Sequence, residues 1–191
     1  MQFEAIETAR LRLRPPVTAD AEAIFNAYAG DPDVTRYLSW PTHRDIDATL
    51  AFIGFSEQQW RRWPVGPLLI ERRDGGDLIG SSGIDFETDY RAATGYVLRA
   101  DAWGQGYASE ALAAMVALAR QLGLWRLEAI CHVEHGASAR VLHKAGFSRE
   151  GVLRAHTRFP NLGTHDPQDV LLFALLPKEM SPATPRPTPA A

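Results

Sequence analysis

Two glycines in one short segment give this sequence its clearest chemical signal. The segment is Trp103-Gly104-Gln105-Gly106-Tyr107-Ala108, and an alanine-rich stretch typical of a helix follows it. A helix N-terminus has free backbone N–H groups and the positive end of the helix dipole. Glycines let these groups approach an anion closely, so a pyrophosphate can bind there without a charged side chain. A tight turn without a ligand would use the same glycines, so the spacing alone leaves both interpretations open.

Two other classes of anion site fit this segment less well. A P-loop has lysine and then serine or threonine at the start of its helix, whereas Tyr107-Ala108-Ser109 contains no lysine. A dinucleotide-binding turn has a third glycine and lies early in a parallel sheet. Here the third glycine is absent, and the preceding chain is predicted to form an antiparallel meander. The segment therefore favours neither of these classes.

Composition sets wider limits on function. The chain has 191 residues, a formal net charge of −3, 46% hydrophobic residues and 23% charged residues. These values are typical of one soluble domain, with no general attraction to nucleic acid or to an anionic membrane. Cys131 is the only cysteine, so we expect neither an intramolecular disulfide nor a thiolate metal site. With no visible signal peptide or membrane-spanning run, we expect a cytoplasmic protein.

The elements around the glycine turn indicate an α+β domain. Apolar–polar alternation and turn residues predict strands at 10–14, 66–71, 78–86, 92–99, 126–133, 147–156 and 170–175. Helices are predicted at 19–29, 32–37, 44–61, 107–122 and 137–145. We expect one domain over residues 1–176. Five prolines among residues 177–191 predict a disordered tail.

Three segments in a fixed order carry a family resemblance. They are Gly95-Tyr96-Val97-Leu98, the stretch from Trp103 to Ala111, and the stretch from Ala137 to Phe147. Together they resemble the core of the GNAT acyltransferases, especially the branch of ribosomal-protein N-terminal alanine and serine acetyltransferases. The resemblance covers about Glu7 to Leu176. It implies a mixed, largely antiparallel sheet that is splayed between strands 92–99 and 126–133, with helices on both faces.

The resemblance also implies an acetyl-CoA site. Backbone N–H groups of the glycine turn would bind the pyrophosphate, and the backbone of the splayed strand would pair with pantetheine. His135 stands where the family usually has asparagine, and it either contacts pantetheine or is a solvated loop residue. The residues implied to bind the cosubstrate are Val97, Leu98, Arg99, Trp103, Gly104, Gln105, Gly106, Tyr107, Ala108, Ser109, His135 and Ser138.

Acyl transfer to an amine needs a base for the amine and an acid for the thiolate leaving group. Ser138 occupies the position where some relatives are proposed to protonate the sulfur, although it could instead cap its helix. Glu128 is the acidic residue of its predicted strand and shares a face with Ile130 and His132, so it is the candidate base. The alternatives are an ion pair of Glu128 with arginine, or Asp85, Glu87 or a water chain as the base. We expect Cys131 to be a core residue and the amine to attack directly.

The acceptor is the least determined part of this prediction. Tyr37, Trp40 and His43 lie in a loop that covers the acceptor side in the family, where they could frame an amine or serve packing alone. We expect transfer to a primary amine, with a protein N-terminus favoured over an aminoglycoside or polyamine. A non-catalytic acyl-CoA-binding module and a nucleotide-binding module are the alternatives from other classes. Either a monomer or a homodimer is compatible with the sequence.

Overall fold

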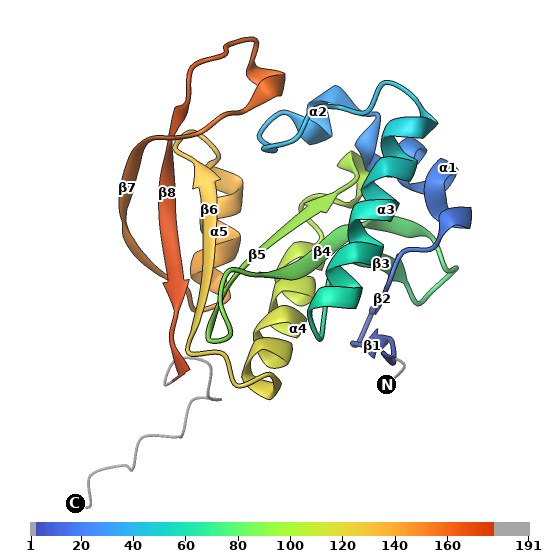
Figure 1. Ribbon diagram of the computed structural model, residues 1–191, viewed down its shortest axis with the longest axis horizontal. Coiled ribbons are helices and arrows are strands. Elements are labelled where there is room, and N and C mark those ends of the chain that lie inside the picture. Colours follow the sequence, from blue (N-terminus) through green and yellow to red (C-terminus); the bar gives the residue numbers. More distant parts are fainter. Residues whose placement is uncertain (1–2, 178–191) are drawn as a thin grey trace, which may run out of the picture.

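The computed structural model describes residues 3–177 of the chain (Figure 1). The predicted proline-rich tail, apart from Pro177, lies outside the described residues, so its disorder stays a prediction. Eight strands of the described part form a single sheet in the order β1-β2-β3-β4-β5-β6-β8-β7. Their bounds are β1 Ile6–Glu7, β2 Leu11–Arg14, β3 Leu68–Arg72, β4 Leu78–Phe86, β5 Arg91–Leu98, β6 Arg126–His132, β7 Ser148–Thr157 and β8 Gln168–Leu175.

The sheet is antiparallel except where β5 meets β6, and there it opens. These two strands pair in parallel only from Arg91 opposite Arg126 to Ala93 opposite Glu128. Beyond this point β5 stays paired with β4 up to Leu98, while β6 continues along β8 up to His132. Each strand follows its own antiparallel neighbour, and right-handed twist then carries the two strands apart. The predicted splay of the central strands is confirmed.

Helices cover both faces of the sheet, as the sequence predicts (Figure 1). One face bears α1 (Ala21–Ile24), α2 (Pro32–Thr35) and α3 (Ile46–Arg62), and the other bears α4 (Tyr107–Gln121) and α5 (Gly136–Lys144). The α1–α3 side has its own small core, in which Ile24, Tyr28 and Ile53 pack on Val97 of β5. The larger core lies under α4 and α5, and its central members include Leu112 and Met115.

Local sequence explains where the longest helices begin. Asp45 precedes α3, and its carboxylate accepts the backbone N–H of Ala48 at 2.9 Å. In α4 the apolar residues recur at helical spacing, so one side is fully buried.

The predicted first helix is less regular than we expected. It starts as a 3-10 turn over Thr18–Asp20 and ends as a π-helical turn over Phe25–Ala29. Asp20 holds the first turn, because its carboxylate accepts the N–H of Val17 at 2.7 Å and pairs with Arg14.

Candidate functional site

The glycine turn leads directly into α4. Gly104 and Gly106 both have left-handed backbones, with φ of 74° and 83°. Glycine adopts this region without the steric cost that other residues meet. Gly106 is the residue before α4, and no side chain caps the helix there. The first N–H groups of α4 are therefore free to bind an anion, which is the property predicted for this turn.

Side chains hold the turn from outside. The indole Nε1 of Trp103 donates to the carbonyl of Leu98 at 2.7 Å, and Gln105 Nε2 donates to the carbonyl of Asp101 at 2.6 Å. Arg10 Nη1 donates to the carbonyl of Gln105 at 3.0 Å. Because the side-chain N–H groups of Trp103 and Gln105 donate within the protein, an anion at this turn would bind to backbone N–H groups.

Glu110, in the first turn of α4, fixes this helix to the β1–β2 turn. Its carboxylate accepts from Arg10 Nε at 2.7 Å, from the Arg10 backbone N–H at 2.8 Å and from the Thr8 hydroxyl at 2.6 Å. Burial opposes ionisation, but these hydrogen bonds outweigh it and hold the pKa of Glu110 below its ordinary value. The guanidinium of Arg10 also lies 4.4 Å from the centre of the Tyr107 ring.

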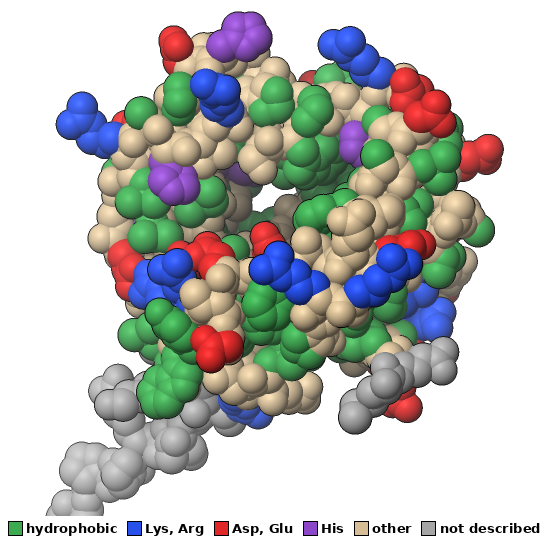
Figure 2. Space-filling view, in the orientation of Figure 1, with side chains coloured by type: hydrophobic (Ala, Val, Ile, Leu, Met, Phe, Trp, Pro, Cys, Tyr) green, Lys and Arg blue, Asp and Glu red, His purple; other side chains and the backbone are tan. Residues whose placement is uncertain are grey.

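A cleft of about 650 Å³ occupies the splay between β5 and β6. Figure 2 shows it as a hollow near the centre of the visible face, with hydrophobic side chains along its rim. On the α1–α3 side its floor includes a row across three strands, because Asp85 of β4 lies opposite Ala93 of β5, which lies opposite Glu128 of β6. Cross-strand partners share one face of a sheet, so both carboxylates border the cleft where the splay begins. Gly95 continues the floor, and a β-carbon there would meet nothing within 4 Å.

On the α4–α5 side, three polar side chains meet across the splay. The Tyr96 hydroxyl lies 3.1 Å from Ser138 Oγ, and both residues border the cleft together with Cys131. Burial raises the pKa of Tyr96 to about 12, although its hydrogen bond with Ser138 acts in the opposite direction. Burial also raises the pKa of the Cys131 thiol. A free thiolate is therefore disfavoured, which agrees with our expectation that Cys131 is a core residue.

Comparison with known proteins identifies the family. The description "Acetyltransferase (GNAT) domain" matches residues 10–148 of the chain. The uncharacterized N-acetyltransferase YoaA of Bacillus subtilis is 36% identical over 162 residues, which cover 81% of this chain and 88% of that protein. The chain belongs to the GNAT acetyltransferase family.

Solved structures of GNAT proteins have the same fold. A GNAT-family acetyltransferase from Bacillus anthracis superposes with a TM-score of 0.79 at 24% identity, covering 92% of this chain and 99% of that one. The ribosomal-protein acetyltransferase RimL in complex with coenzyme A superposes with a TM-score of 0.78 at 22% identity, covering 91% of this chain and 98% of RimL. This protein is thus an N-acetyltransferase with the GNAT fold, and a CoA thioester is the cosubstrate that its family supports.

Within this GNAT domain, Ser138 does not cap its helix. It lies inside α5, whose preceding residue is His135, and no side chain caps that helix. The alternative that we left open for Ser138, a helix cap, is therefore wrong, because the hydroxyl is directed to Tyr96 instead. Its proposed role as an acid toward the CoA sulfur stays a prediction.

His135 lies in an aromatic stack rather than in a freely solvated loop. Tyr37 stacks on both His135 and His132, with ring centres 4.9 Å and 5.0 Å apart, and Phe159 packs edge-on against His132. Burial lowers the pKa of His135, and the neighbouring His132 and Arg140 lower it further. His135 is therefore neutral at pH 7 and keeps one nitrogen able to accept and one able to donate.

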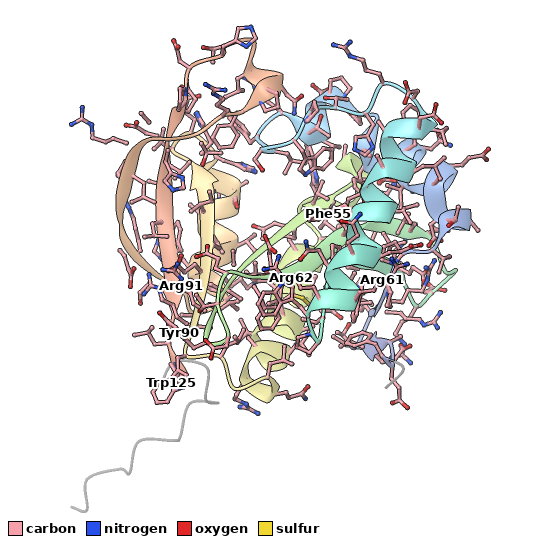
Figure 3. All side chains as sticks on the ribbon, in the orientation of Figure 1. Phe55, Arg61, Arg62, Tyr90, Arg91 and Trp125 are labelled. Carbon is pink, nitrogen blue, oxygen red and sulfur yellow. The ribbon has the colours of Figure 1, made fainter. Side chains whose placement is uncertain are left out.

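Glu128 of this acetyltransferase is half-buried and forms an ion pair with Arg126, which also binds Glu150. The ion pair that we kept as an alternative is thus present. Of the other two candidate bases, Glu87 pairs with Arg91 at 2.6 Å, whereas the carboxylate of Asp85 has no hydrogen bond or ion pair within the described residues. Figure 3 shows Arg91 near the start of β6, where β5 and β6 are still paired.

Two loops that are far apart in sequence meet at the side of the cleft where the acceptor is expected. The side-chain oxygen of Asn161 accepts from the Thr42 N–H at 2.9 Å, and its Nδ2 donates to the carbonyls of Thr35 and Trp40. Tyr37 and Trp40 line the cleft, whereas His43 lies behind Trp40 with ring centres 5.2 Å apart.

One residue of this site, Tyr96, has no role that the sequence alone assigns. The alternation of β5 could have indicated it, because that alternation places Tyr96 on the side of the sheet that carries α5. Among residues 3–177, none of the helices combines the length and the hydrophobicity of a membrane-spanning segment.

Proposed function

We propose that this enzyme transfers an acetyl group from acetyl-CoA to a primary amine by direct attack of the amine. The observation that carries the proposal is the continuity between the open splay and the uncapped start of α4. The edge of β5 that faces β6 is unpaired from Thr94 to Leu98, and the uncapped α4 begins at Tyr107, nine positions after Leu98. A phosphate-bearing thioester suits this arrangement, since extended backbone can pair with pantetheine and free N–H groups can bind pyrophosphate.

The chemistry would use residues on the two sides of the splay. Ser138, hydrogen-bonded to Tyr96, would give a proton to the departing sulfur on the α4–α5 side. On the opposite side Glu128 would accept the proton of the amine, directly or through water, with Asp85 as the alternative base. Holding amine and thioester together in the cleft would supply much of the rate.

A protein N-terminus is our first candidate for the acceptor. The supporting observations are a cleft that is open at the surface and a fold shared with RimL, which is described as an acetyltransferase of a ribosomal protein. A small-molecule amine is the second candidate, since a cavity of about 470 Å³ beside α3 could hold part of such a molecule. The single cysteine, which is buried, fits a reducing compartment such as the cytoplasm.

The test is thiol release from acetyl-CoA and succinyl-CoA with peptides that begin with alanine or serine and with a panel of small amines. We expect acetyl-CoA to be the faster donor and an alanine or serine peptide the best acceptor. Release with a small amine alone would replace the first candidate by the second. Tight CoA binding without release of the CoA thiol in the presence of any acceptor would favour a non-catalytic acyl-CoA-binding module and contradict the proposal.

A further inference from the structure

A second cavity, of about 470 Å³, lies beside α3 on the acceptor side of the sheet. Most of its wall is apolar, and it contains no carboxylate, lysine or arginine. The residues around it are Ile24, Tyr28, Trp40, His43, Ala48, Ala51, Phe52, Phe55 and Ser81. A cavity with this lining disfavours a polyamine or another polycation, because nothing in it would neutralise a positive charge.

The cavity adjoins the main cleft. Trp40, Phe52, Phe55 and Ser81 border both spaces, so these side chains form the partition between them. The α3 residues of the wall recur at positions 48, 51, 52 and 55, the spacing of one helix face. Figure 3 shows Phe55 on the side of α3 that faces the hollow, and the residue is 48% exposed. A group bound in the main cleft can therefore extend into this side pocket past a partition of aromatic rings.

One buried polar atom in the side pocket, the hydroxyl oxygen of Tyr28, lacks a well-formed hydrogen bond within the described part of the chain. Tyr28 is 2% exposed, and its hydroxyl makes no hydrogen bond of normal geometry to any described residue. Burial raises the pKa of Tyr28, only partly offset by the neighbouring Ser81 hydroxyl, so the phenol stays protonated. Buried hydroxyls in proteins nearly always have a partner, because an unpaired one loses its hydration without compensation. A ligand atom in the pocket would supply that partner.

His43 offers a second polar atom. Its Nδ1 lies 2.8 Å from Thr49 Oγ1, while no partner is found for Nε2 within the described residues. Burial lowers the pKa of His43, although Asp45 acts in the opposite direction, so the ring is neutral at pH 7. The pocket thus combines aromatic faces with two neutral polar groups, Tyr28 and His43.

We infer that this side pocket binds an aromatic ring of the acceptor, one that bears a polar substituent such as a hydroxyl. The inference rests on the proposed function, because it assigns the pocket to the amine substrate. Aromatic rings pack favourably on other aromatic rings, and a single polar substituent would satisfy the Tyr28 hydroxyl. The ring belongs either to a small arylalkylamine or to a side chain near the N-terminus of a peptide.

Binding is tested without turnover, by ligand-observed NMR titration of the full chain with p-cresol and with toluene. We expect both to bind, p-cresol more tightly. Ala48→Leu fills the pocket and should abolish the binding of both compounds. Leu50→Phe, on the outer side of α3, should leave both affinities unchanged. Tyr28→Phe should weaken p-cresol about 5-fold and leave toluene unchanged, since one hydrogen bond is lost. The melting temperature of Tyr28→Phe should equal or exceed that of the parent protein. The inference would be overturned if Ala48→Leu bound p-cresol and toluene as well as the parent protein does. It would also be overturned if Tyr28→Phe had a lower melting temperature than the parent protein but the same affinity for p-cresol.

Turnover then distinguishes the two sources of the ring. Thiol release should be faster with tyramine than with putrescine if the ring comes from a small amine. It should be faster with a serine peptide carrying tyrosine at the second position than with its alanine counterpart if the ring comes from a peptide. Equal rates within both pairs would contradict the inference while leaving acetyl transfer intact. Absence of thiol release with every amine would contradict the proposed function, and the p-cresol titration would still show separately whether the pocket binds an aromatic ring.

Discussion

The hydroxyl of Tyr96 lies 3.1 Å from Ser138 Oγ and so joins strand β5 to helix α5 across the splay. Burial raises the pKa of Tyr96 to about 12, so the phenol keeps its proton at neutral pH. Either oxygen can be the donor in this pair. If Ser138 gives its proton to a leaving thiolate, Tyr96 is placed to replace it, which makes the two hydroxyls a single proton-supplying unit.

Ser138→Ala should therefore lower kcat by roughly 100-fold, the scale of losing a general acid. The melting temperature should change little, because Ser138 caps no helix. Tyr96→Phe should lower kcat as well, and the double variant should be no worse than the poorer single variant, since the two groups act together. Tyr90→Phe is the control, because Tyr90 is 52% exposed. Unchanged kcat in Ser138→Ala would remove its catalytic role.

Glu128→Gln tests the base. We expect loss of the acidic limb of the pH profile of kcat/KM, because a glutamine accepts no proton from the amine. Asp85→Asn is the matched variant, since Asp85 flanks Ala93 on the opposite strand of the same row. Asp85→Asn should keep the acidic limb of the pH profile of kcat/KM. The reverse pattern would show that Glu128 serves only its ion pair with Arg126 and that Asp85 is the base.

Most of the fold followed from the sequence, whereas the partners within the site did not. Alternation and glycine turns predicted β4 and β5 closely, because period and turn chemistry are local properties. The brief strand β1 was missed, since Ile6–Glu7 is too short to show a period. The Tyr96–Ser138 bond and the stack of Tyr37 on His135 join residues 42 and 98 positions apart, and only the packed chain brings them together.

The glycine turn can be tested against a matched turn elsewhere. Gly104 and Gly76 have φ of 74° and 73°, and a β-carbon at either would meet nothing within 4 Å. Alanine at either position should therefore reduce stability by a similar amount, roughly 1 kcal/mol. Only Gly104→Ala should weaken acetyl-CoA, by about tenfold in calorimetric titration, because its backbone would contact the pyrophosphate. Equal CoA affinities in the two variants would place the pyrophosphate elsewhere.

Glu110 should make stability depend on acid pH. Its folded-state pKa lies below the ordinary value of 4.5, so its contribution is complete above that pH and is lost as pH falls through the folded pKa. Glu110→Gln should cost roughly 2 kcal/mol at pH 7, the scale of hydrogen bonds to a charged group. Urea unfolding of both proteins from pH 7 to pH 3 should show this difference shrinking below about pH 4.5. A difference that grows toward acid pH would contradict the assignment.

Direct transfer to the amine is the central claim, and a single-turnover experiment tests it most directly. The enzyme is mixed with one equivalent of acetyl-CoA and an excess of the best acceptor, quenched at intervals, and the thiol, the acceptor and the intact protein are quantified together by mass spectrometry. We predict that free CoA and acetylated acceptor appear in equal amounts and at the same rate, with no acetyl group on the protein. Acetylated protein at Cys131 that forms and decays at the turnover rate, or CoA retained without any acetylated acceptor, would contradict the account.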